Sequence, residues 1–164
     1  FLGGAVTNVA VHLSSLGVPS AVASCVGSDQ LGREARRRLE TRGVDTSLMQ
    51  AHGGLGTGMV IATIDDEGDA SYEFDTPAAW DGLRWTDELG DAILAAQVTV
   101  IGTIACRLGS SEGATSAATI SAVRSAAGED SLVMDINLRP PWYEAGHVLA
   151  LCRGDAEDAA ALAI

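Results

Sequence analysis

The chain has 164 residues, of which 47% are hydrophobic and 20% charged, a balance that indicates a folded protein and excludes a disordered one. Its formal net charge of −12 disfavours nucleic acid and anionic membranes as partners. All 10 basic residues are arginine, so neither a Schiff-base lysine nor a GxxxxGK[ST] phosphate loop can form.

Cysteine and histidine give no sign of a metal or disulfide framework. Cys25, Cys106 and Cys152 are far apart and form no CxxC pair, which favours reduced thiols, with Cys25 and Cys106 in the core. The histidines (His12, His52 and His147) lack metal-ligand spacing. No secretory signal and no run of eighteen apolar residues occurs, so the cytoplasm is the expected location and no membrane partner is expected.

The first predicted element is a helix that follows Gly3 and Gly4 and is ended by Gly17. Its apolar positions recur at helical spacing (Val6, Val9, Ala10, Leu13 and Leu16). The glycines allow close backbone approach, the helix start offers free N–H groups, and Asn8 adds an amide donor and acceptor. The combination suits a polyhydroxylated small molecule; the alternative is an ordinary helix after a turn.

The spacing of these residues resembles the amino-terminal signature of the ribokinase family, the PfkB-type sugar kinases. The matching positions are Gly3, Gly4, Asn8, Ala10, Gly17 and Gly27. One position departs, because Val6 stands where the family prefers Gly, Ala or Pro. The resemblance implies that Gly3, Gly4 and Asn8 bind substrate. It also implies an α/β fold, a three-layer α/β/α arrangement with a mainly parallel, Rossmann-like sheet and a small β lid, here incomplete.

A second helix is predicted after Ser28 or Asp29, either of which can cap it, and Gly43 ends it. Leu31, Ala35 and Leu39 form the expected buried stripe. The basic cluster at 36–38 is interpreted as a solvated face rather than a phosphate site. The pattern Gly27-x-Asp29-x-x-Gly32 also occurs in the ribokinase family, where it frames the start of the second helix.

Residues 57–64 alternate with period two, a polar turn follows at 65–69, and 71–74 is extended again, which predicts a hairpin. The resemblance makes it a lid at about residues 55–76 that covers the sugar and, in some relatives, forms a dimer surface; a homodimer through the lid is thus one expectation. Tyr72, Phe74 and Trp80 are candidates to stack on a sugar ring, and packing is the alternative role for each.

Further along, helices from Thr86 and from 110–127 alternate with short apolar strands at 98–101 and 131–136. This order predicts a parallel sheet covered on both faces, in which ligands gather beyond the carboxyl ends of the strands. Gly4, the segment 102–105 and the segment 135–139 fall at such places. The end of the strand at 98–101 is similar to the corresponding strand end of fructokinase-like relatives, which implies that the backbone at Gly102 lies near the sugar.

The stretch 135–142, DINLRPPW, resembles the D-x-N-x-R…W motif of fructokinase-like and 2-keto-3-deoxygluconate-kinase-like members of the family. Arg139 is the leading candidate for contact with an acidic sugar or a phosphate, and a salt bridge to Asp135 is its alternative. Asp135 and Asn137 either touch substrate or hold the loop, since both residue types stabilise turns.

Two parts of the family pattern are missing. No Gly-Ala-Gly-Asp-like motif, which supplies the family's anion hole and base, occurs in the chain, and the sugar-binding Asp of a strand before the glycine pair is absent. Residues 153–158 match poorly the segment that relatives place near metal and phosphates, so no metal site is assigned. We therefore expect a fragment without a catalytic residue of its own, lacking the carboxyl-terminal ATP-binding half.

The resemblance implies that the whole protein uses ATP and Mg²⁺ to phosphorylate a monosaccharide or sugar acid, such as fructose or 2-keto-3-deoxygluconate. A non-catalytic sugar-binding relative and a nucleoside kinase of the same family stay open as alternatives. A dinucleotide-binding domain is disfavoured, because Gly3-Gly4 lacks the GxGxxG spacing and no strand precedes it.

Overall fold

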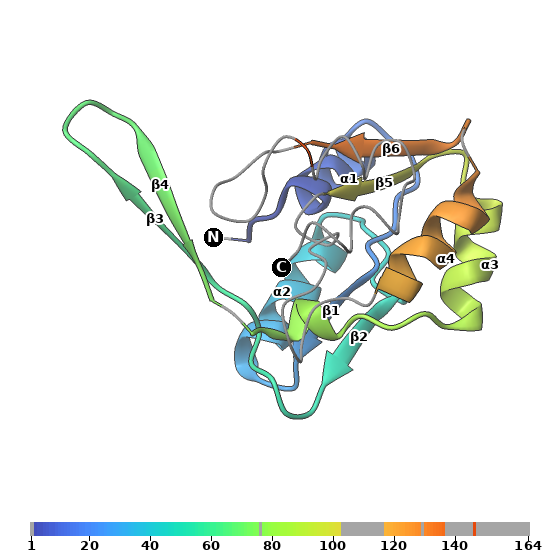
Figure 1. The fold of residues 1–164 in the computed structure, drawn as a ribbon, viewed down its shortest axis with the longest axis horizontal. Coiled ribbons are helices and arrows are strands. Elements are labelled where there is room, and N and C mark those ends of the chain that lie inside the picture. Colours follow the sequence, from blue (N-terminus) through green and yellow to red (C-terminus); the bar gives the residue numbers. More distant parts are fainter. Residues whose placement is uncertain (1, 76, 103–116, 129, 137–145, 147–164) are drawn as a thin grey trace.

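The computed structural model describes residues 2–75, 77–102, 117–128, 130–136 and 146. Within them the chain forms helices, strands and one 3-10 helix, η1 (Figure 1). In chain order these are α1 (Ala5–Ser15), β1 (Ser24–Gly27), α2 (Gln30–Thr41), β2 (Met49–His52), β3 (Val60–Ile64), β4 (Ala70–Phe74), η1 (Ala79–Gly82), α3 (Asp87–Ala95), β5 (Thr99–Gly102), α4 (Ala117–Ala127) and β6 (Leu132–Asp135).

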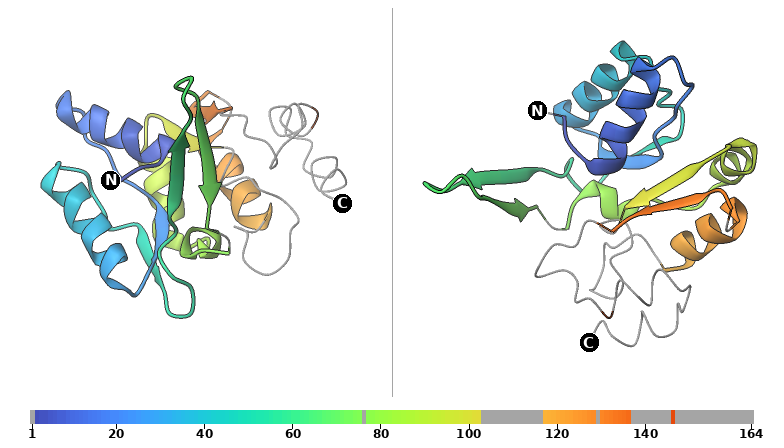
Figure 2. Two further views of the ribbon diagram at one scale, coloured as in Figure 1. Left: turned by 90° about the vertical axis from the view of Figure 1, so that its left-hand side faces the viewer. Right: turned by 90° about the horizontal axis from the view of Figure 1, so that it is seen from above.

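The strands of the body pair in parallel, as the alternation of strands and helices predicts. β1 pairs with β2 and β5 pairs with β6, both in parallel, whereas β3 and β4 form an antiparallel hairpin. Helices α1 and α2 lie on one side of the parallel strands and α4 lies on the other (Figure 2). The layered α/β arrangement and the hairpin are confirmed, and the role of the hairpin as a lid stays a prediction.

Two apolar clusters hold the body together. One joins α1, α2 and the β1–β2 pair around Ala10, Val26 and the fully buried Leu39. The other joins α3, α4 and the β5–β6 pair around Leu89, Ile101 and Val123. Each helix thus buries one apolar face against a strand pair, the packing that stabilises most amphipathic helices.

The predicted helix ends are confirmed. Gly17 and Gly43 follow α1 and α2 with φ of 78° and 76°, in the left-handed region that favours glycine. The carboxylate of Asp29 caps α2 by accepting a hydrogen bond from the Gly32 N–H at 2.8 Å. The Thr86 hydroxyl caps α3 in the same way, accepting from the Leu89 N–H at 3.2 Å. Sequence-local chemistry therefore sets these boundaries.

Some predicted burial is wrong. Leu31 is 51% exposed, because Gly32 is the first-turn residue of α2 that faces β1: a Cβ added to Gly32 would overlap the carbonyl oxygen of Gly27. Leu16, expected in the apolar stripe of α1, is 79% exposed because the helix has ended before it. The apolar run 18–26 contributes a strand only from Ser24 onward, after an isolated bridge between Ala21 and Asp45.

The basic cluster of α2 is a solvated face, as interpreted from the sequence. Arg37 and Arg38 both pair with Glu34 at 2.7 Å. Arg36 instead donates to the backbone carbonyls of Thr46 and Met49, each at 2.7 Å, and so ties the helix to the start of β2. None of these guanidinium groups is left for a phosphate.

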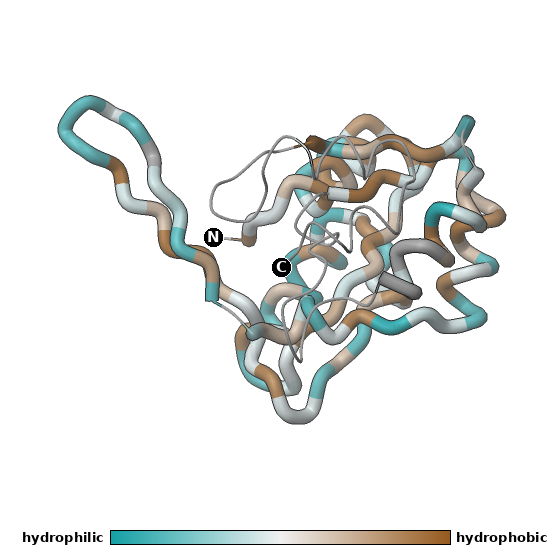
Figure 3. Tube along the Cα trace, viewed as in Figure 1, coloured by the Kyte–Doolittle hydropathy of each residue, from teal (hydrophilic) through white to brown (hydrophobic). Residues whose placement is uncertain are grey.

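The hairpin β3–β4 extends away from the body (Figures 1 and 2). β3 is exposed over its whole length, whereas Phe74 at the end of β4 is half-buried. The turn is hydrophilic, while much of the stem is apolar (Figure 3). Asp65 shapes the turn by accepting hydrogen bonds from the Glu67 and Asp69 N–H groups at 3.0 and 2.8 Å. Among the described residues, no helix is long and apolar enough to cross a membrane.

Candidate functional site

The start of α1 leaves backbone donors open. Gly4 occupies the N-cap position with φ of 110°, and no side chain caps the helix there. The first bond of the helix runs from the Asn8 N–H to the Gly4 carbonyl at 2.9 Å, so the N–H groups that precede it have no partner within the helix. A side chain at Gly4 would require a strained backbone and would approach the Thr7 hydroxyl. The helix start can therefore donate to a ligand.

Asn8 stands one turn inside α1 on an exposed position. Its side chain makes no hydrogen bond to any residue that the structure describes, so its amide keeps both a donor and an acceptor available. Asn8 is thus a polar group next to an open helix start, and its contact with a substrate stays a prediction.

The carboxyl ends of β5 and β6 lie beside this helix start. Gly102 ends β5 and is paired in register with Asp135, which ends β6. A Cβ added to Gly102 would lie 3.5 Å from Val6 Cγ1, so the first turn of α1 sits against the end of β5. The start of α1 and the carboxyl ends of β5 and β6 thus lie on one side of the molecule, the side from which the hairpin extends (Figure 1).

Other predicted site residues are placed differently or not at all. Arg139 and Asn137 lie outside the described residues, as do 103–105 and the remaining cysteines, Cys106 and Cys152. Tyr72 lies on β4 opposite Ala62 and is 42% exposed. Gly3 is exposed, and a Cβ there would meet nothing within 4 Å.

The root of the hairpin is the segment that leads into β3 together with the one that follows β4. It is fixed to the body by a polar network that sequence reasoning missed. Asp29 accepts hydrogen bonds from both the N–H and the hydroxyl of Thr57 at 2.7 Å, and the Gly27 N–H donates to the same hydroxyl at 2.9 Å. The bond from the Thr57 N–H, with those from Gly32 and the Thr57 hydroxyl, lowers the pKa of Asp29 to about 2. The Gly27-x-Asp29-x-x-Gly32 pattern therefore joins the second helix to the strand that enters the hairpin.

The segment that follows β4 is hydrogen-bonded to the segment that precedes β3. The Asp75 N–H donates to the Met59 carbonyl at 3.0 Å and the Ala79 N–H to the Gly56 carbonyl at 2.9 Å. Trp80 packs against Gly58 so closely that a Cβ there would overlap its ring. Trp80, a candidate for sugar stacking, is thus part of the root packing in this structure.

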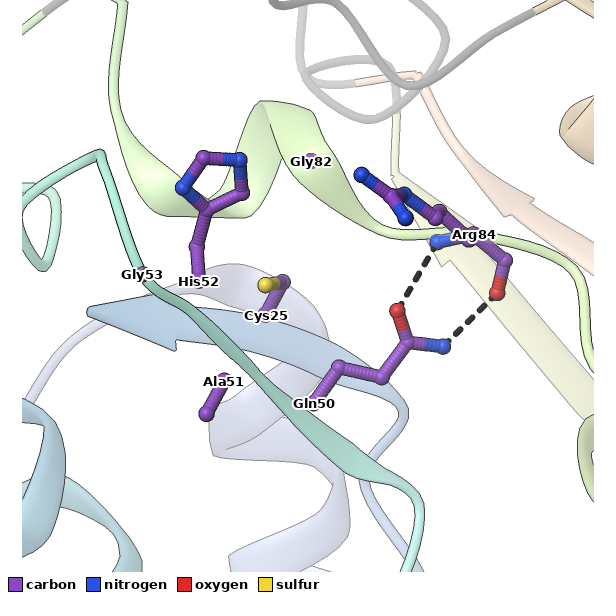
Figure 4. A pocket seen from close by; sticks show the side chains of 7 residues that line it. All are labelled: Cys25, Gln50, Ala51, His52, Gly53, Gly82 and Arg84. Carbon is purple, nitrogen blue, oxygen red and sulfur yellow. Dashed lines mark hydrogen bonds between the residues drawn. The ribbon is translucent and has the colours of Figure 1, made fainter. Parts of the chain in front are cut away.

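A cavity of about 350 Å³ lies elsewhere, against β1 and β2 below η1 (Figure 4). It is lined by Cys25, Gln50, Ala51, His52, Gly53, Gly82 and Arg84. Cys25 is buried, as expected from the sequence, yet no pattern pointed to this cavity, because its residues come from three separate elements. Among the described residues, no group of three or more His, Cys, Asp or Glu side chains could hold a metal ion.

Comparison with known proteins agrees with this architecture. The chain is 32% identical over 150 residues to the fructokinase of Salmonella typhimurium and 30% identical over 156 residues to that of Escherichia coli. Each alignment covers 92% of this chain and 48% of the relative, so the chain spans about half the length of these relatives.

Solved structures give the same result for the fold. An uncharacterized sugar kinase from Pyrococcus horikoshii, solved in complex with ATP, matches with a TM-score of 0.70 at 26% identity, over 96% of this chain and 47% of that one. A fructokinase from Vibrio cholerae matches with a TM-score of 0.65 at 26% identity, over 96% and 53% of the two chains. The model of the pfkB family carbohydrate kinases matches residues 1–154, and the chain belongs to that family.

Proposed function

We propose that the protein containing this chain is an ATP-dependent kinase that phosphorylates a hydroxyl of a monosaccharide, fructose first among the candidates, and that it works in the cytoplasm, where ATP is available. The observation that carries the proposal is the open start of α1 beside the ends of β5 and β6, in a chain whose curated relatives are fructokinases. A sugar acid such as 2-keto-3-deoxygluconate is the second candidate.

Complementary hydrogen-bonding groups support a sugar at this place. The backbone at Gly3 and Gly4 and the amide of Asn8 donate, Asn8 also accepts, and Asp135 offers a carboxylate at the end of β6. Because Gly102 has no side chain, a ligand between the start of α1 and the end of β6 can approach its backbone closely. We assign Arg139 to a carboxylate or phosphate of the substrate, and Asn137 and Tyr72 to secondary contacts.

ATP and Mg²⁺ are proposed as the cofactors of the whole protein. Support comes from the ATP complex of the sugar kinase of Pyrococcus horikoshii, which this chain resembles in fold. Phosphoryl transfer needs a base for the attacking hydroxyl and positive groups around the migrating phosphate. We assign neither role to a residue of this chain, which supplies the sugar side of the site.

The test is phosphorylation by the full-length protein of fructose, ribose, 2-keto-3-deoxygluconate and adenosine. We expect turnover of fructose or the sugar acid, and Asn8→Ala is expected to cost about 1–3 kcal/mol of substrate binding, measured through KM. Thr41→Ala, on the far end of α2, serves as the control. Preference for adenosine would identify a nucleoside kinase, and sugar binding without turnover a non-catalytic relative; an unchanged KM in Asn8→Ala would remove Asn8 from the site.

We further propose that the hairpin is a homodimer surface. The register places apolar residues of both strands on one face: Val60, Ala62 and Ile64 of β3, and Ala70, Tyr72 and Phe74 of β4. Ile64 is 70% exposed, and the opposite face carries Ile61 together with the polar Thr63, Ser71 and Glu73. An isolated two-stranded hairpin is marginally stable in water, so an uncharged apolar face of this kind favours a covering partner, here a second copy.

Ile64→Asp and Thr63→Asp form a matched pair for this test, because they add the same charge to opposite faces of one strand. We expect Ile64→Asp to shift the full-length protein toward monomer in sedimentation velocity, with Thr63→Asp unchanged. A monomeric wild-type protein, or equal effects of the two substitutions, would contradict the dimer.

A further inference from the structure

The cavity between η1 and the β1–β2 pair lies apart from the proposed sugar site and is lined by a different set of polar side chains. Its volume of about 350 Å³ falls within the range of small-molecule sites. In Figure 4 the side chains of His52 and Arg84 stand on either side of Gly82, with the thiol of Cys25 between them. Among the described residues that line it, none is acidic, although the chain has 22 acidic and 10 basic residues.

Arg84 brings a positive charge to this cavity. No hydrogen bond or ion pair joins its guanidinium to any residue within the described part of the chain. Its backbone is held in place, because the Gln50 amide donates to the Arg84 carbonyl at 2.7 Å and accepts from the Arg84 N–H at 3.0 Å. The guanidinium therefore keeps its planar set of donors for a ligand that enters from solvent.

His52 is held so that it adds one more donor. Its Nδ1 accepts hydrogen bonds from the N–H groups of Gly54 and Leu55 at 3.1 and 2.8 Å. An accepting Nδ1 places the ring proton of the neutral imidazole on Nε2. Gly82 keeps this edge of the ring accessible, because a Cβ there would lie 2.7 Å from Cδ2 and 3.4 Å from Nε2.

The floor of the cavity is neutral. Cys25 is 3% exposed, and burial raises the pKa of its thiol, an effect that the charge of Arg84 only partly offsets. The described part of the lining thus presents a guanidinium, an imidazole N–H and a protonated thiol, and it carries no negative charge that would repel an anion.

We propose that this cavity binds a small molecule through an oxyanion group, a carboxylate or a phosphate, which the Arg84 guanidinium and the His52 Nε2–H hold together. A guanidinium binds a carboxylate or a phosphate through two parallel hydrogen bonds, and an adjacent N–H donor adds a third hydrogen bond. The site is separate from the sugar pocket and independent of the proposed kinase activity, since none of its residues belongs to α1, β5 or β6.

The test is titration calorimetry of the full-length protein with inorganic phosphate and, separately, acetate. Arg84→Gln keeps the two backbone bonds to Gln50 and removes only the charge, so the fold is expected to persist. We expect at least a tenfold weaker affinity in Arg84→Gln for the anion that binds. Arg42→Gln, which removes an exposed guanidinium outside the cavity, is the control and is expected to bind as the wild type does.

The two anions distinguish the ligand classes: binding of phosphate alone assigns a phosphate group, and binding of acetate alone a carboxylate. A second readout is independent of affinity, because a bound anion must shift the NMR resonances of the His52 ring and leave those of His12 unchanged. Equal affinity of wild type and Arg84→Gln for both anions, the absence of binding, or an unmoved His52 signal at saturation would overturn the proposal.

Discussion

The root and the tip of the hairpin are built in opposite ways. At the root, the Thr57 N–H and hydroxyl bond to Asp29, and Gly58 packs under Trp80. At the tip, the turn is held mainly by Asp65, and β3 is exposed over its whole length. A segment fixed at its base and free along its stem can cover a ligand without loosening the body, since local stability differs sharply between the two ends.

The largest effect on the free energy of unfolding is expected from Gly32→Ala, which adds a methyl group to the tight contact at the root. In Gly32→Ala the new Cβ would overlap the Gly27 carbonyl and lie 2.9 Å from the Thr57 hydroxyl, so β1 or the hairpin entry must shift. We expect the free energy of unfolding to fall by about 3 kcal/mol in urea denaturation. Gly53→Ala is the control, because a Cβ there meets nothing within 4 Å and is expected to cost at most about 0.5 kcal/mol. Equal effects would show that the root is not tightly packed.

A smaller effect, visible mainly in acid, is expected from Asp29→Asn. The bonds from Thr57 and Gly32 lower the pKa of Asp29 to about 2 in the folded state, below an unfolded value of about 3.9. The stability that this carboxylate contributes is therefore present above pH ~4 and is lost as pH falls toward 2. Asp29→Asn should lower Tm at pH 7 by roughly 5 °C and flatten the fall of Tm between these two pH values.

Asp66→Asn, in the exposed turn at the hairpin tip, provides the matched control for this acid effect. It is expected to follow the wild-type Tm at every pH, because no hydrogen bond joins Asp66 to the described residues. A parallel loss in both variants would mean that acid acts through protonation of the 22 acidic residues in general rather than through the root.

The contrast between root and tip also marks what could be read from the sequence. The tip follows from local signals, since alternation at 57–64 and a polar turn with glycine predict a hairpin, whose register the structure then supplies. A cap on α2 from Ser28 or Asp29 was also predictable, and the structure shows that Asp29 provides it. The bond from Asp29 to Thr57 joins residues 28 positions apart, and no local pattern encodes that pairing.

The candidate sugar site was predictable for a different reason. In a parallel sheet the strand ends and helix starts meet at one edge, so Gly4, Gly102 and Asp135 could be placed together before their contacts were known. The cavity at Cys25, His52 and Arg84 had no such guide, because its lining combines residues of β1, β2 and η1 with residues that follow β2 and η1. The exposure of Leu31 had none either, since a glycine took the position expected for an apolar side chain.

The smallest effect on stability is expected from Gly68→Ala at the tip of the hairpin. Gly68 has φ of 91°, where an alanine is strained, and its N–H donates to the Asp65 carbonyl at 3.1 Å. The strain of about 1 kcal/mol falls on a hairpin that contributes little to the body. Amide hydrogen exchange in β3 and β4 should therefore accelerate about fivefold, with exchange in β1 and α2 and the global Tm unchanged. A fall of the global Tm matching that of Gly32→Ala would mean that tip and root unfold as one unit, and the hairpin could not then move independently over a bound sugar.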